Sequence, residues 1–329
     1  PMALPRFAPD HFTLALVGTV VLASLLPASG PMARVLEVAT TGVVSLLFFL
    51  HGAKLSRQAI LGGLGHWRLH LSIFAATFAL FPLLGWALRP VLEPLVTPEM
   101  YLGVLFLCTL PATVQSAIAF TAMARGNMPA AVCSASASTL LGIVVTPILV
   151  GLVLGRSAEG GSVLGAISKI SLQLLLPFIV GHLLRPLIGG FIHRHAKRVK
   201  LVDQGSILLV VYSAFSAAVV SGLWRETPLP ALAGLLVLCA VLLTLVLTLT
   251  TWGARALGFA KEDEITLVFC GSKKSLISGV PMAKVLFASS TVGAIVLPLM
   301  IFHQLQLMVC AVLAQRYARR PEHPATQPA

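Results

Sequence analysis

The sequence predicts an all-α polytopic membrane protein with ten transmembrane helices, arranged as two inverted repeats of five. Of its 329 residues, 57% are hydrophobic and only 10% are charged, which is typical of membrane proteins. A helix needs roughly 20 apolar residues to cross the hydrocarbon core, and apolar blocks of about that length recur along the whole chain. Most of the 23 lysines and arginines fall in alternate connections between these blocks, as the positive-inside rule requires.

The predicted spans follow from the apolar blocks in order. They lie at about residues 11–28, 35–53, 68–88, 100–123, 129–154, 163–184, 203–222, 229–256, 265–287 and 291–317. These continuous apolar blocks disfavour a β-barrel, because the strands of a barrel are shorter and alternate between apolar and polar residues. The first block is interpreted as a retained helix and not as a signal peptide, because nine further blocks follow it. The basic segment 193–200 is predicted to be a loop at the water or headgroup level.

The chain divides near Gly160. Residues 1–160 form the predicted first repeat, residues 161–318 the second, and residues 319–329 a disordered tail. Five spans in each half force the halves into opposite orientations. The charge distribution predicts a multi-pass membrane protein with both termini in the cytoplasm. A bacterial inner or plasma membrane is its expected location. It also explains the net charge of +12 without a nucleic-acid partner.

Lys273 and Lys274 lie inside the ninth predicted span, and ionisable side chains at membrane depth generally mark a functional site. The fourth span has a polar interruption at the matching place. Such interruptions expose backbone groups that a substrate, an ion or water must satisfy, and half-helix N-termini favour anions. Ordinary kinking at Pro111 and Gly271 is the alternative, and either lysine could instead snorkel or be structural. The predicted substrate and ion crossover comprises Thr113, Gln115, Ser116, Ser272, Lys273, Lys274 and Ser275.

Other polar residues of the spans are weaker candidates. Residues that could line a cavity are Ser136, Ser138, Thr139, His303 and Gln304, with helix-packing hydrogen bonds as the alternative for the last two. The five cysteines are scattered without a CxxC pair, so neither a disulfide framework nor a zinc site is expected. No catalytic constellation or phosphate-binding loop is recognisable. The sequence therefore predicts neither an enzyme nor an ATP-driven pump, and no cofactor.

Several motifs together resemble the bile acid:sodium symporter superfamily, most closely its SBF-like branch, which includes the vertebrate bile-acid-transporter-like member seven group. They are Phe-Leu-His-Gly-Ala-Lys-Leu-Ser at 49–56, Thr-Val-Gln-Ser at 113–116, Ala-Arg-Gly-Asn at 124–127, Ala-Ser-Thr-Leu-Leu-Gly at 137–142, Thr-Pro at 146–147 and Phe-His-Gln at 302–304. The resemblance covers essentially the whole chain. It implies a panel domain of spans 1, 2, 6 and 7, a core domain of spans 3–5 and 8–10, and a substrate site between them.

The resemblance also implies two sodium ions behind the crossing of spans four and nine, but the sequence departs from that pattern. The family's glutamate in span nine falls at Phe269 or Cys270, and two hydroxyl ligands of span five fall at Ala131 and Ala135. A sodium ion about 4 Å from an ammonium would be repelled by roughly 4 kcal/mol at an effective dielectric of 20. Sodium coupling is therefore not carried over, and no sodium ligand is assigned.

The function predicted from these observations is secondary active transport of a small organic anion, which is bile-acid-like or another carboxylate. The predicted partners are this anion and the lipid of the membrane. Two alternatives stay open. One is a proton-coupled or lysine-gated exchanger, in which one ammonium replaces a sodium ion. The other is a non-transporting membrane regulator with the same fold.

Overall fold

The computed structural model describes residues 11–54, 64–154 and 171–320, and these ranges are helical with no β-strand. In them, seven helices are long and apolar enough to cross a membrane, judged by length and composition: Gly30–Lys54, Trp67–Ala87, Met128–Leu154, Leu172–Arg194, Ala196–Val220, Leu229–Ala256 and Ser289–Ala318. These seven coincide with predicted spans two, three, five, six, seven, eight and ten. The other three predicted spans contain α1 (His11–Leu25) and two interrupted helices.

Both interruptions occur where the sequence predicts them. In the fourth predicted span, α7 (Pro98–Thr109) is separated from α8 (Gln115–Met123) by a non-helical stretch. In the ninth, α15 (Lys261–Gly271) is separated from α16 (Leu276–Leu286). The remaining α-helices and π-helical turns in chain order are α2 (Gly30–Lys54), α4 (Trp67–Ala75), a π-helical turn (Ala76–Leu80), α5 (Phe81–Ala87), α6 (Arg89–Leu92), α9 (Met128–Leu154), a second π-helical turn (Ser171–Leu175), α11 (Leu176–Arg194), α12 (Ala196–Val220), α13 (Leu223–Glu226), α14 (Leu229–Ala256) and α17 (Ser289–Ala318). Short 3-10 helices lie at Leu64–His66 and Glu93–Leu95.

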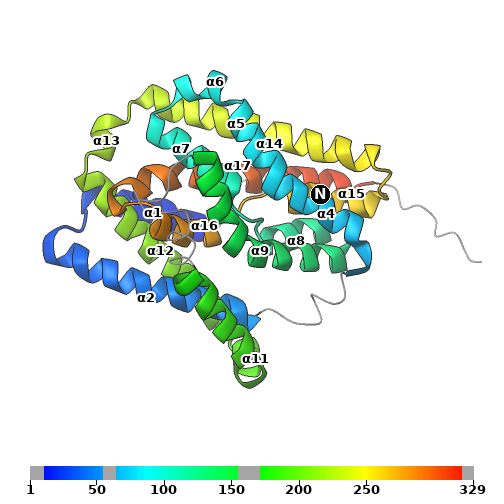
Figure 1. Ribbon diagram of the computed structural model, residues 1–329, viewed down its shortest axis with the longest axis horizontal. Helices are drawn as coiled ribbons and strands as arrows, with labels where there is room; N and C mark the ends of the chain where they lie inside the picture. Colours follow the sequence, from blue (N-terminus) through cyan, green and yellow to red (C-terminus); the bar gives the residue numbers. More distant parts are fainter. Residues whose placement is uncertain (1–10, 55–63, 155–170, 321–329) are drawn as a thin grey trace, which may run out of the picture.

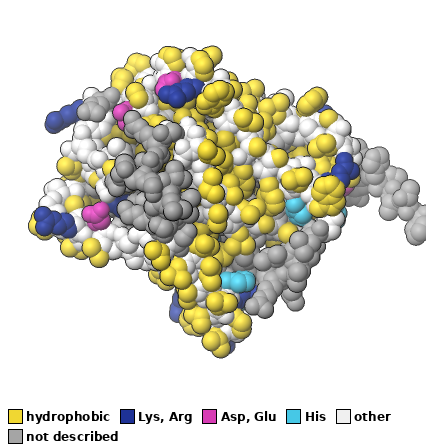
Figure 2. Space-filling model, viewed as in Figure 1, with side chains coloured by type: hydrophobic (Ala, Val, Ile, Leu, Met, Phe, Trp, Pro, Cys, Tyr) yellow, Lys and Arg dark blue, Asp and Glu magenta, His cyan; other side chains and the backbone are white. Residues whose placement is uncertain are grey.

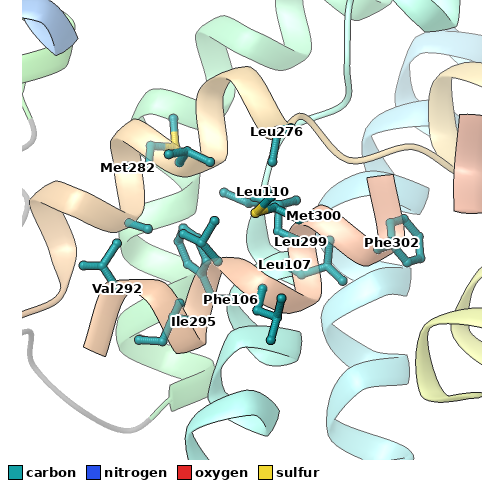
Figure 3. Packing of buried hydrophobic residues seen from close by; sticks show 14 of the residues in the cluster. Phe106, Leu107, Leu110, Leu276, Met282, Val292, Ile295, Leu299, Met300 and Phe302 are labelled. Atoms are coloured by element: carbon teal, nitrogen blue, oxygen red, sulfur yellow. The ribbon is translucent and has the colours of Figure 1, made fainter. Parts of the chain in front are cut away.

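The helices pack as two groups. In the first, α2 lies along α11, and α12 contacts both α1 and α2; Figure 1 shows α2 and α11 together on one side of the molecule. In the second, α7, α9, α14, α15, α16 and α17 pack on one another, with α14 on the side away from α2. Contacts of α12 with α16 and α17 join the groups. Buried side chains of α7, α16 and α17, including Phe106, Met282 and Leu299, interlock in the second group (Figure 3).

Large apolar side chains cover the outside of the described helices. Val38, Leu187 and Leu229 are 76%, 80% and 80% exposed, and Figure 2 shows a mostly apolar face with charged side chains near its margins. A water-soluble monomer rarely exposes so much contiguous apolar surface, whereas lipid tails solvate it without cost. The surface therefore agrees with the composition in indicating a membrane environment.

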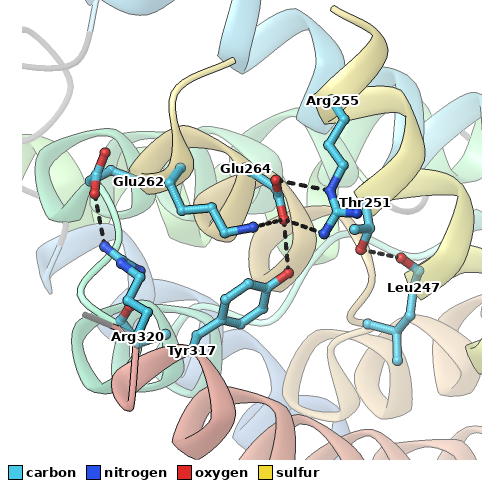
Figure 4. Close-up of polar contacts among 9 residues, drawn as sticks. Leu247, Thr251, Arg255, Glu262, Glu264, Tyr317 and Arg320 are labelled. Atoms are coloured by element: carbon cyan, nitrogen blue, oxygen red, sulfur yellow. Dashed lines mark hydrogen bonds and ion pairs between the residues drawn. The ribbon is translucent and has the colours of Figure 1, made fainter. Parts of the chain in front are cut away.

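One end of the second helix group is held by charged side chains (Figure 4). The buried carboxylate of Glu264 accepts hydrogen bonds from Lys261 Nζ at 2.6 Å and Tyr317 Oη at 3.1 Å, and pairs with Arg255 at 3.3 Å. Arg320 donates to Glu262 Oε1 at 2.8 Å. The ends of α14, α15 and α17 are thus joined, so their basic residues share one end of the molecule.

The predicted loop at residues 193–200 is wrong in its conformation. α11 continues to Arg194 and α12 begins at Ala196, so that only His195 separates the two helices. Its φ of −106° and ψ of 26° turn the chain. Charge composition predicted this segment to be at a membrane surface, but Ala, Lys and Arg are also strong helix formers.

The predicted disordered tail begins at residue 319, but Arg320 donates a hydrogen bond to Glu262, as described above. Residues 321–329 and the predicted division near Gly160 lie outside the described residues.

The α2–α11 contact depends on two glycines. A Cβ atom on Gly52 would lie 1.9 Å from Phe178 O, and one on Gly181 would lie 2.0 Å from Phe49 O. Helices in membranes associate through such close backbone approach. Gly52→Ala is therefore expected to separate the helices and lower the melting temperature in detergent by several degrees, the usual effect of overpacking by about 1–3 kcal/mol. Gly42→Ala, in the same helix with open space around it, is the control and should melt like the wild type.

Candidate functional site

The two interrupted helices meet at their breaks. Ser275 N donates to Pro111 O at 3.0 Å, which ties one break directly to the other. Ala112 N donates to Ser138 Oγ of α9 at 3.0 Å. Gly142 of α9 lies so close that an added Cβ would be 2.6 Å from Pro111. The non-helical backbone is therefore buried in protein and hydrogen-bonded, which is one of the conditions under which it is tolerated at membrane depth.

The C-terminal carbonyls of α7 lose their helical partners at the break, and most receive others nearby. Phe106 O accepts from Thr109 Oγ1 at 2.7 Å, and Leu107 O accepts from Leu110 N at 3.2 Å. Thr109 O accepts from Thr146 Oγ1 of α9 at 2.8 Å. The carbonyls of Cys108 and Leu110 are left, and both point to a lysine.

Lys274 Nζ donates to three carbonyl oxygens: Thr77 O at 2.7 Å, Cys108 O at 2.9 Å and Leu110 O at 2.7 Å. The side chain is 0% exposed, and its ammonium lies 4.1 Å from the ring centroid of Phe81. A lysine ammonium has three N–H donors, so each finds one acceptor here. In the described part of the chain no carboxylate pairs with it; its charge is met by carbonyl dipoles, the end of the α7 dipole and an aromatic face.

Lys273 points elsewhere. Its ammonium donates to Ser116 O of α8 at 3.0 Å and lies 4.0 Å and 5.0 Å from the ring centroids of Phe120 and Phe269. It too is 0% exposed. The two neighbouring lysines, which lie side by side in the non-helical stretch between α15 and α16, therefore contact different helices and have different partners.

Gln306 of α17 replaces backbone hydrogen bonds missing at the α15–α16 break. Its Oε1 accepts from Lys274 N at 2.9 Å, and its Nε2 donates to Lys274 O at 2.9 Å. Nε2 also lies 2.9 Å from His303 Nδ1. The sequence analysis missed Gln306, because no local pattern marks which of the three glutamines of this helix, Gln304, Gln306 and Gln315, faces the break.

A cavity of about 310 Å³ lies between the two helix groups, in front of the crossing. The first group contributes Phe12, His51, Lys54, Phe178, Lys200, Asp203 and Gln204, and the second Thr113, Val114, Gln115, Ser116, Ser136, Thr139, Ser275, Ile277, Ser278, His303 and Leu307. Its lining thus combines cationic and hydroxyl side chains with aromatic and aliphatic ones.

A larger, basic cavity of about 710 Å³ adjoins the first between α2, α11 and α12. The two share Lys54, Gln115, Lys200 and Asp203 as lining residues, and Arg185, His182 and His193 lie in the larger one. Excess positive charge in such a concave region concentrates anions.

The predicted site residues divide between the cavity and its back wall. Thr113, Gln115, Ser116, Ser275, Ser136, Thr139 and His303 line the smaller cavity. Ser272, Lys273 and Lys274 lie behind it, and Ser138 bonds the Ala112 backbone. Gln304 is not among the residues that line either cavity. The predicted site residues thus fall on two sides of the crossing, one that lines the smaller cavity and one that is buried behind it.

Asp203 was not predicted as a site residue. Its carboxylate pairs with Lys54 of α2, while its Oδ1 is buried and accepts no hydrogen bond from the described residues. The signal available in the sequence was an acidic residue at the start of the seventh predicted span, three positions after Lys200.

The helix ends at the crossing have opposite polarity on its two sides. The N-termini of α8 and α16 lie at the smaller cavity, where Gln115, Ser116, Ile277 and Ser278 line it. N-terminal N–H groups and the positive dipole end favour an anion there. The C-terminal carbonyls of α7 face the opposite side, toward Lys274. A side that presents helix N-termini and a side that presents helix C-terminal carbonyls therefore lie back to back, an arrangement found in secondary transporters with discontinuous helices.

Comparison with known proteins identifies the family to which such a membrane transporter fold belongs. A profile of the SBF-like CPA transporter family matches residues 10–319, and the chain belongs to that family. This confirms the resemblance seen in the sequence and makes the protein a multi-pass membrane transporter-family member, not an enzyme.

Three relatives cover nearly the same length. The chain is 67% identical over 324 residues to "Uncharacterized protein PA2026" of Pseudomonas aeruginosa, covering 98% of this chain and 97% of the relative. It is 57% identical over 314 residues to "Putative symporter YfeH" of Escherichia coli, covering 95% and 94%. It is 28% identical over 317 residues to "Sodium/bile acid cotransporter 7" of Rattus norvegicus, covering 94% and 93%.

Proposed function

We propose that this protein is a secondary active transporter that carries a small organic anion by alternating access. The observation that carries the proposal is the pair of half-helix N-termini, of α8 and α16, at a cavity between two helix groups. Cationic residues at the cavity and its neighbour supply further attraction for an anion. The family assignment and the names of the relatives support transport.

The movement we propose is a rocking of one helix group against the other. The panel would consist of α1, α2, α11 and α12, and the core would contain the interrupted helices. Inverted repeats of five spans, with ten crossings and both termini in the cytoplasm, would place the breaks at mid-membrane and make the two access states related by symmetry. The grouping of contacts and the position of the cavity between the groups support this division.

The cavity lining favours an amphipathic carboxylate as substrate. Phe12, Phe178 and Leu307 offer apolar contacts, while hydroxyl groups of Thr113 and Ser278 offer hydrogen bonds near the helix N-termini. Uptake of a labelled bile acid and of smaller carboxylates into proteoliposomes tests this class. Saturable uptake of a carboxylate supports it, and uptake that prefers organic cations contradicts it.

A substitution that adds one negative charge to the cavity gives a sharper test. Gln115, in the first turn of α8, is exposed in the smaller cavity, so Gln115→Glu places a carboxylate where we expect the anion. Two like charges about 4 Å apart repel by roughly 1 kcal/mol in water and 4 kcal/mol at an effective dielectric of 20. Uptake should therefore fall about tenfold or more, while the melting temperature stays the same or rises, because a helix N-terminus favours a carboxylate.

Gln115→Met is the matched control, since it removes the amide without adding charge. It should retain much more uptake than Gln115→Glu. If Gln115→Glu transports the carboxylate as fast as the wild type, the anion does not bind at the α8 N-terminus.

A proton-coupled exchanger is a second candidate, favoured by Asp203. Its carboxylate is buried at both cavities, and its Oδ1 has no hydrogen-bond donor in the described ranges. Such an oxygen could accept a proton during the cycle. Uptake driven by an imposed pH gradient and lost in Asp203→Asn would support coupling through this residue. Absence of flux for every carboxylate and gradient would instead favour a membrane regulator.

A further inference from the structure

The cation-binding side of the crossing is already filled by the protein itself. Discontinuous helices of secondary transporters bind coupling cations through unwound carbonyls and half-helix C-termini. Here those groups are Cys108 O and Leu110 O at the end of α7, together with Thr77 O, and all three bind the Lys274 ammonium at 2.7–2.9 Å.

The third carbonyl is exposed by a specific backbone distortion. In the π-helical turn Ala76–Leu80, Phe81 N donates to Ala76 O, five residues back, instead of to Thr77 O. The next residue, Pro82, has no N–H to offer. Thr77 O is thus free to turn toward the crossing. A π-helical turn in this position is typical of a functional site, because it directs a backbone oxygen at a ligand.

We propose that Lys274 is a tethered cation that occupies the coupling-ion site of this transporter, so that its anion transport is independent of sodium. This inference rests on the proposed transport function. Sodium appears in the names of the vertebrate relatives, but this chain's residues do not fit a sodium ion at the crossing. All three carbonyls already accept a hydrogen bond from the ammonium.

Electrostatics and geometry both exclude a second cation at these oxygens. A sodium ion about 4 Å from the ammonium would lose about three orders of magnitude in affinity to charge repulsion. Gln306 further fixes the lysine by holding its backbone N–H and C=O at 2.9 Å each. Lys273 does not share this role, because its ammonium contacts one carbonyl and two aromatic rings.

Removing the tethered cation should create a site for a free one. Lys274→Ala deletes a propylammonium group and leaves three carbonyl oxygens pointing into the vacated space. The melting temperature of this variant in detergent should rise by about 3 °C or more in saturating sodium, potassium or propylammonium chloride relative to choline chloride. The wild type and Lys273→Ala should shift by less than about 1 °C in the same salts, and Lys274→Met, which fills the space without charge, should not respond.

Transport gives the second readout. Wild-type proteoliposomes should take up the anion equally well when choline replaces sodium on both sides. The proposal would be overturned if none of the three cations raised the melting temperature of Lys274→Ala. It would also be overturned if sodium changed the melting temperature or the anion uptake of the wild type. Should Lys274→Ala not fold, the wild-type melting curves decide alone. Because melting needs no flux, failure to find any transported anion would reject the proposed function and leave the tethered cation to be judged separately.

Discussion

Gln306→Leu is expected to cause a severe loss of folded protein. The substitution keeps a side chain of similar size but removes both the acceptor for Lys274 N and the donor for Lys274 O. Gln306 is 0% exposed, so water cannot replace either partner. Each buried backbone group left without a hydrogen bond costs about 1–3 kcal/mol. The melting temperature and the yield of monodisperse protein after detergent extraction measure the effect.

Two further variants separate the loss of these hydrogen bonds from a general effect of substitution in α17. Gln315→Leu changes a half-buried glutamine of the same helix, whose side chain forms no hydrogen bond with the described residues, and it should melt like the wild type. Gln306→Glu keeps an acceptor for Lys274 N but loses the donor, so its stability should be intermediate. Equal melting of Gln306→Leu and the wild type would mean that the break does not depend on Gln306.

The breaks between α7 and α8 and between α15 and α16 could be predicted from the sequence because the signals are local. Pro111 and Gly271 disfavour helix, and the polar residues beside them are unusual in apolar surroundings. The pair of lysines likewise stands out within its own segment. These features identify a crossing without any knowledge of what it contacts.

The roles of individual residues at the crossing depend on distant contacts, and these have no local signal. Lys274 meets Thr77 across 197 residues, and the carbonyl it meets is available only because the backbone forms a π-helical turn before Pro82. A sequence of apolar residues does not distinguish that turn from an ordinary helix. The sequence therefore left open which lysine faces the crossing, and in the structure both are buried.

The prediction of a loop at residues 193–200 was wrong in conformation, for a reason that composition contains. The same Ala, Lys and Arg residues that indicate a membrane surface also stabilise helices, so the chain turns only at His195. That continuity brings Lys200 and Asp203, in the first turns of α12, to the cavities.

The ion pair between Lys54 and Asp203 should behave asymmetrically in a double-mutant cycle. Asp203 is buried, with 9% of its side chain exposed, whereas 34% of the Lys54 side chain is exposed. Lys54→Met therefore strands a buried carboxylate and should cost on the order of 2–3 kcal/mol, less than for a fully buried pair. Asp203→Leu leaves an ammonium that can reach water, and it also removes an oxygen that already lacked a donor, so it should cost about 1 kcal/mol or less.

The double variant Lys54→Met/Asp203→Leu is accordingly expected to be as stable as Asp203→Leu alone, and more stable than Lys54→Met. The exposed pair Arg89–Glu93 is the control, and its cycle should show no measurable coupling. If both single variants lose stability equally and the losses add, the two side chains do not interact in the folded protein. Because α2 and α12 belong to the same helix group, the pair does not bridge the groups that are proposed to move. If the double variant is stable but takes up the anion slowly, these two charges act directly on the substrate path, and the slow uptake does not result from a change in the fold.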